Sequence, residues 1–144
     1  LKWMCLYGCN SLRLNDVNDM WTKFLLPMPP NIHVLLGSDS KVYIVASFGS
    51  QFADDLNGVS SASGGSPMTL ISSWYDAGKV AHQAAAHSRN PFKRPGTVVL
   101  SAAFRDSDYE SGEPGTASDT IWNYPSDYNV DWTAIDWQSQ QVYP

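Results

Sequence analysis

The side chain best placed for chemistry in this sequence is the thiol of Cys9. A short apolar run over residues 2–8 ends in Gly8, so Cys9 is expected at the carboxyl end of a strand. Sites in open α/β sheets form at this edge. Asn10 and Ser11 continue the turn and offer backbone donors to a developing negative charge. We therefore take Cys9 as a candidate nucleophile and Asn10 as a candidate catalytic neighbour.

A structural role is the alternative for Cys9, because a free cysteine often packs as a small buried hydrophobe. The second cysteine, Cys5, lies four positions earlier. In an extended strand their Cα atoms would be roughly 13 Å apart, too far for a disulfide. Two thiols alone also fall short of a four-ligand zinc site. The sequence therefore predicts neither a metal nor a cofactor.

A cysteine nucleophile needs a base, because a free thiol with a pKa of ~8.5 is mostly protonated at neutral pH. His33 falls inside a predicted strand, which favours a packed histidine of the core or sheet face. His82 and His87 fall near the end of a predicted helix, where histidines cap carbonyls or face solvent. Their spacing of five does not match an i, i+4 metal pair. No histidine is thus indicated as the partner of Cys9.

The apolar pattern predicts alternating strands and helices. This order is typical of a three-layer α/β sandwich with a mainly parallel sheet and right-handed crossovers. Residues 41–47 fit either a strand or a packed loop. The expected elements are strands at 2–8, 32–36 and 97–104, a helix capped by Asn15 or Asp16 with a stripe from Val17 to Leu25, a helix at 49–57 capped by Gly58, and a long helix from Pro67 to about His87.

From Arg105 onward no period is sustained, so we expect an α/β core over residues 1–104 and an irregular tail over 105–144 packed on it. The tail is rich in aromatic residues, which can anchor it to the core, contact another subunit or stack on sugars. The candidate contact residues are Trp122, Tyr124, Tyr128, Trp132 and Trp137.

An acidic alternation opens the tail, at Asp106, Asp108 and Glu110. Oxygen ligands at alternate positions suggest a calcium loop, but an EF-hand loop also needs glycine and glutamate at its sixth and twelfth positions. Counted from Asp106, those positions hold Ser111 and Ala117. The pattern therefore favours a solvated acidic loop.

Composition excludes two classes of partner. The net charge is −5 and the basic residues are scattered, which argues against nucleic-acid binding. No apolar run approaches the roughly 20 residues of a membrane span. The chain opens at Leu1 inside an apolar stretch and without a secretory signal pattern, so we expect a segment upstream of Leu1. The low charge and the aromatic tail slightly favour an exported protein.

The segment Tyr7-Gly8-Cys9-Asn10-Ser11-Leu12 resembles the strand-end cysteine segment of caspase-like cysteine peptidases, the group of caspases, gingipains and legumains. A closer resemblance, over about residues 2–85, is to the uncharacterised DUF6345-type family. It rests on the order of short motifs: the cysteine segment, Ile32-His33-Val34-Leu35-Leu36-Gly37, Gly49-Ser50-Gln51-Phe52-Ala53 and Trp74-Tyr75-Asp76-Ala77.

The resemblance implies a cysteine peptidase whose catalytic histidine precedes the cysteine, and therefore lies upstream of Leu1. The chain alone would then be a poor enzyme acting on a protein or peptide substrate. The alternatives are a non-catalytic extracellular or assembly-forming domain, which uses the aromatic tail in a homo-oligomer, and a sugar-binding module built on the tail tryptophans.

Overall fold

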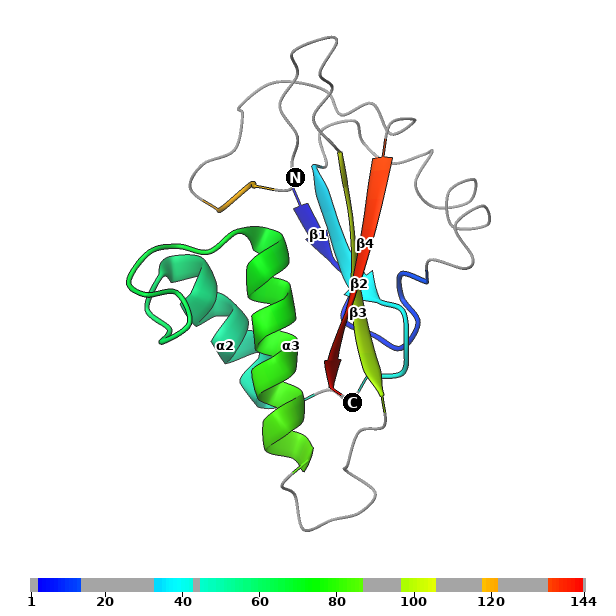
Figure 1. Ribbon diagram of the computed structural model, residues 1–144, viewed down its shortest axis with the longest axis horizontal. Coiled ribbons are helices and arrows are strands. Elements are labelled where there is room, and N and C mark those ends of the chain that lie inside the picture. Colours follow the sequence, from blue (N-terminus) through cyan, green and yellow to red (C-terminus); the bar gives the residue numbers. More distant parts are fainter. Residues whose placement is uncertain are drawn as a thin grey trace, which may run out of the picture.

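A computed structural model describes residues 3–13, 33–42, 45–86, 97–105, 118–121 and 135–143. These residues form an α/β fold of one sheet and two helices (Figure 1). In chain order the elements are β1 (Trp3–Cys5), β2 (Val34–Ser38), α2 (Ala46–Asn57), α3 (Leu70–Ala86), β3 (Val98–Arg105) and β4 (Ile135–Tyr143).

The sheet is mixed, with the spatial order β1-β2-β3-β4. Only the β1–β2 pairing is parallel, and β2–β3 and β3–β4 are antiparallel. The expectation of a mainly parallel sheet is therefore wrong for the described strands. The reason is that two successive helices separate β2 from β3: α2 returns the chain along the sheet, α3 reverses it again, and β3 must then run opposite to β2 (Figure 1).

The end of the expected irregular tail is a strand. β4 pairs with β3 from Val98–Tyr143 to Arg105–Ile135, with a register shift between Val98 and Val99. Its sequence, IDWQSQQVY, lacks the apolar alternation that marks a half-buried strand. A strand at the edge of a sheet can do without this pattern, because backbone pairing does not require apolar side chains. Of the candidate contact residues of the tail, Trp137 lies in β4. The structure does not describe Trp122, Tyr124, Tyr128 and Trp132. The acidic run from Asp106 and the helix expected up to Leu25 also lie outside the described residues.

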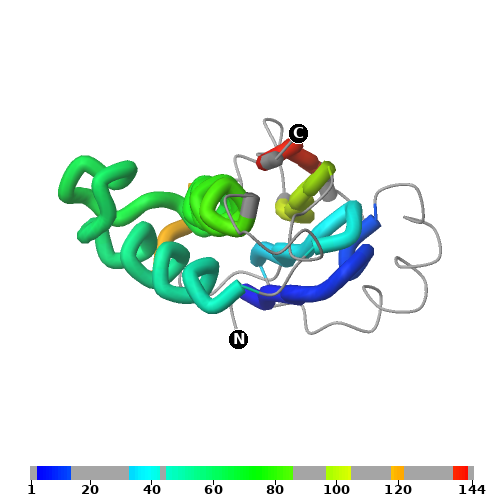
Figure 2. Tube along the Cα trace, turned by 90° about the horizontal axis from the view of Figure 1, so that it is seen from below, coloured from blue at the N-terminus to red at the C-terminus, as the bar shows by residue number. Residues whose placement is uncertain are grey.

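Both described helices lie on the same side of the sheet (Figures 1 and 2). Trp74 of α3 is the largest fully buried side chain, and its Nε1 donates to the carbonyl of Gly37 at 2.8 Å. Phe48 of α2 packs edge-on against Trp74 with ring centroids 4.7 Å apart. The core therefore forms where the two helices meet β2 and β3. Within the described segments, no helix is long and apolar enough to span a membrane.

Local signals set the helix ends. α2 stops at Gly58, which has the left-handed φ of 73° that the glycine pattern predicts. α3 begins at Leu70 rather than at Pro67, because Thr69 caps it by accepting the N–H of Ser72 at 3.1 Å on Oγ1.

β2 is buried along its whole length and continues through Gly37 to Ser38, whereas the pattern predicted that Gly37 would close it. Leu12 occupies the space that a Cβ at Gly37 would take. Glycine therefore marks a close approach here, and the strand continues past it.

Candidate cysteine site

Cys9 lies in the loop that follows β1, and backbone hydrogen bonds hold this loop against the carboxyl end of β2. The N–H of Leu6 donates to Leu36 O at 2.8 Å, and the N–H of Leu12 donates to Ser38 O at 3.0 Å. Because β1 and β2 are parallel, their carboxyl ends share one edge of the sheet, as expected for a site in an α/β fold.

Serine hydroxyls reinforce the loop. Ser11 Oγ donates to Leu6 O at 2.6 Å, and Ser38 Oγ donates to Gly8 O. From β3, the buried Ser101 donates to Leu12 O at 2.5 Å. Ser38 and Ser101 were missed from the sequence, and Ser11 was considered there only as a backbone donor. The available signal was a polar residue directly after a buried strand at Ser38, and another inside an apolar strand at Ser101.

The Cys9 side chain is exposed and makes two backbone contacts with Val42. Sγ accepts the Val42 N–H at 3.4 Å and donates to Val42 O at 3.3 Å. The thiol is therefore accessible and fixed in position.

Asn10 follows Cys9 with a φ of 51°, in the left-handed region that asparagine tolerates better than most residues. Its N–H donates to Ser40 O at 2.9 Å. That donor is therefore already used, and the backbone oxyanion contact expected from Asn10 is not available. The side chain of Asn10 is exposed, and its amide can donate hydrogen bonds.

Cys5 contrasts with Cys9. Both thiols are free, but Cys5 belongs to β1 and packs against the hydrophobic core. Burial raises the pKa of Cys5 to about 12. The two cysteines thus separate into a structural thiol and an accessible one.

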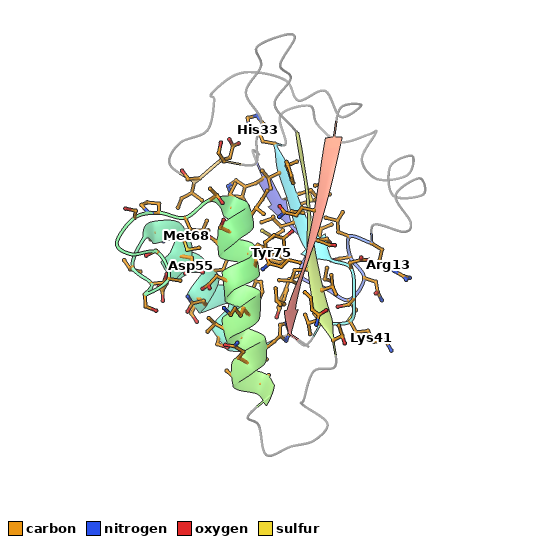
Figure 3. All side chains as sticks on the ribbon, viewed as in Figure 1. Arg13, His33, Lys41, Asp55, Met68 and Tyr75 are labelled. Carbon is orange, nitrogen blue, oxygen red and sulfur yellow. The ribbon has the colours of Figure 1, made fainter. Side chains whose placement is uncertain are left out.

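His33 lies far from Cys9. It is buried just before β2, where its Nδ1 is 3.1 Å from Asp119 Oδ2. Five residues of strand separate it from Ser38, or about 16 Å along the sheet. Figure 3 shows His33 at the opposite end of the sheet from Lys41, which follows Ser40 at the Cys9 loop.

His82 is fully buried on α3. Neither of its ring nitrogens has a hydrogen-bond partner in the described part of the chain. Burial lowers the pKa of His82, so the ring favours the neutral form. The third histidine, His87, lies outside the described residues. No contact thus identifies a base for Cys9, and the described side chains contain no group of three or more metal-ligating residues.

A carboxylate pair bridged by an amide joins the two helices, and sequence reasoning missed it. Gln51 Nε2 donates to Asp55 Oδ1 at 2.9 Å and to Asp76 Oδ2 at 3.3 Å. Asp55 is fully buried. Burial raises the pKa of Asp55, and the negative charge of Asp76 adds to the rise. Gln51 and Asp55 are an i, i+4 pair, but only tertiary packing brings Asp76 to them.

The geometry defines an α/β domain with a mixed sheet and an accessible cysteine at the carboxyl edge of its parallel strand pair. Residues 1–126 match the family described as Domain of unknown function (DUF6345), and the chain belongs to that family. This confirms the DUF6345 resemblance, whereas the caspase-like resemblance finds no support in the comparisons. No curated protein matches the chain, and no solved structure does.

Proposed function

We propose that this domain presents Cys9 as the nucleophile of a cysteine hydrolase of peptide bonds. The observation that carries the proposal is the accessible Sγ that accepts the Val42 N–H, in a loop fixed to the end of β2. Reactive cysteines occupy such exposed positions, whereas structural cysteines pack against apolar side chains, as the partly buried Cys5 does.

In this proposal the Cys9 thiolate attacks the carbonyl carbon of the substrate, and the side-chain amide of Asn10 donates to the oxyanion that forms. The oxyanion collapses with cleavage of the peptide C–N bond, and the amine leaves with a proton from the general base. Water then hydrolyses the thioester, which releases the acid and restores the thiol. The serine hydrogen bonds keep the thiol in place, so that little reorganisation is needed at the reaction step. A histidine upstream of Leu1 supplies the general base, as the caspase-like resemblance implies. The three-layer sandwich expected from the order of strands and helices needs a second helical layer, and we propose that the helix expected up to Leu25 forms it.

Alkylation by iodoacetamide at neutral pH, measured by peptide mass spectrometry, tests the central step. We expect Cys9 in the folded protein to react faster than the same residue in urea, where it is an ordinary thiol. Cys5 is the internal control: with a pKa of about 12, only about one Cys5 in 10⁵ is ionised at pH 7. Cys5 should therefore react only after unfolding.

A folded-state rate for Cys9 at or below the rate in urea would contradict the nucleophile proposal. That result would favour the non-catalytic assembly domain, for which concentration-dependent oligomers are the matching measurement. If Cys9 is activated, Cys9→Ala should abolish peptide cleavage by the protein together with its upstream segment and leave the urea midpoint nearly unchanged. Cys5→Ala is the matched control, and it should retain cleavage at a lower stability.

A further inference from the structure

A groove between α3 and β4 lies at the opposite edge of the sheet from Cys9. Its volume is about 390 Å³, within the usual range of small-molecule sites. β1 and β4 are the two outer strands of the described sheet, and neither Cys9 nor its contact Val42 lines the groove. The groove is therefore separate from the cysteine site.

The β4 wall of the groove carries amides where an apolar pair would be expected. Gln138 and Gln140 stand opposite Ala102 and Leu100, both buried members of the hydrophobic core. Cross-strand partners point to the same face of a sheet, so the two glutamines face the helix layer. Both side chains are nevertheless exposed, because the groove opens in front of them. Two primary amides on the helix-covered face indicate a ligand site rather than packing.

The α3 wall completes a hydrogen-bonding surface. It presents the hydroxyls of Thr69 and Ser72, the carboxylate of Asp76 and the ammonium of Lys79. Gln51, reaching from α2, donates to Asp76 and so orients its carboxylate. Among the described residues that line the groove, one negative and one positive side chain cancel, which disfavours a strongly anionic or cationic ligand.

Apolar surface from Ile71 and Tyr75 also lines the groove. Tyr75 lies where α3 faces the sheet (Figure 3), and its hydroxyl donates to Gln138 O at 3.1 Å. One backbone acceptor of β4 is thus already used by the helix, which argues against an added β-strand as the occupant. Polar walls with an apolar strip suit a compact ligand that has hydroxyls on its rim and C–H groups on its face.

We propose that the α3–β4 groove binds a neutral, hydroxyl-rich ring, such as a single hexose unit of a glycan. Amide and carboxylate groups offer paired donors and acceptors to vicinal hydroxyls, and the strip beside Tyr75 receives the apolar face of the ring. This places a carbohydrate site on the domain in addition to the cysteine site.

Saturation-transfer difference NMR on the 144-residue chain tests the proposal. The probes are the methyl glycosides of glucose, galactose, mannose and N-acetylglucosamine, with N-acetylneuraminic acid as an anionic comparison. We expect a signal from at least one neutral glycoside and a weaker one from the acid. Replacing Gln138 and Gln140 together with alanine should weaken binding at least about fivefold, as the loss of two hydrogen bonds predicts.

The matched control is Gln83→Ala, at an exposed position of α3 outside the groove, which should bind like the original chain. Because Gln138 and Gln140 are exposed, the double variant is expected to fold, and its amide NMR spectrum verifies this. Three results would each overturn the proposal: no saturation-transfer signal from any neutral glycoside, a stronger signal from the acid than from the neutral glycosides, or binding by the double variant equal to that of the original chain. None of these results bears on Cys9, so the two proposals fail separately.

Discussion

Gly78→Ala sets helix propensity against packing at the contact between α3 and the sheet. Alanine is favoured over glycine inside a helix by about 1 kcal/mol, so propensity alone predicts a more stable protein. Gly78 is buried, however, and a Cβ there would collide with Leu100 Cδ1 and approach Val142 Cγ2 to 3.3 Å. The added methyl group therefore has to displace side chains of the core.

Gly49→Ala in α2 is the matched control. Gly49 is exposed, and nothing lies within 4 Å of a Cβ placed there, so this substitution should stabilise the fold by about 0.5–1 kcal/mol. Overpacking a core costs about 1–3 kcal/mol. Because both substitutions share the propensity gain, Gly78→Ala should be less stable than Gly49→Ala by about 1–3 kcal/mol.

Urea unfolding followed by tryptophan fluorescence measures this difference, since the chain has six tryptophans. The dependence on urea should be the same for both variants, so that the midpoints report stability alone. Equal stabilities, within about 0.3 kcal/mol, would refute the close packing of α3 on Leu100 and with it the placement of the helix.

Trp74→Phe removes the donor to Gly37 O and should lower the free energy of unfolding by about 1–3 kcal/mol, because a buried carbonyl loses its partner; an unchanged urea midpoint would show that this bond is not formed. His82→Leu concerns pH. Burial lowers the pKa of His82 below its ordinary 6.5, so the unfolded chain binds a proton at His82 more tightly than the folded protein does. The folded state therefore loses stability as the pH falls through 6.5. The substitution should flatten the decline in stability between about pH 7.5 and about pH 5. If the variant and the original chain lose the same unfolding free energy over this pH range, measured by urea unfolding, the assignment is contradicted.

Much of the secondary structure could be predicted because its signals are local. The apolar run before Gly8 predicted β1, the run before Gly37 predicted β2, and Gly58 predicted the end of α2. β4 could not be predicted from its polar sequence, because the strand is formed by backbone pairing with β3 and not by an apolar pattern of its own side chains. The parallel sheet was predicted wrongly because a two-helix connection reverses the direction of the next strand.

The sequence alone placed Cys9 in a turn at the end of a strand, since an apolar run, a glycine and polar residues are neighbours along the chain. Tertiary structure decided what surrounds the thiol. Val42, which contacts Sγ, is 33 residues away, and Ser101, which supports the loop through Leu12, is 89 residues from it. The α3–β4 groove likewise joins elements that only the packed fold brings together. Periodicity and capping act within a few residues, whereas these contacts form only after helices and strands pack, which a local pattern does not encode.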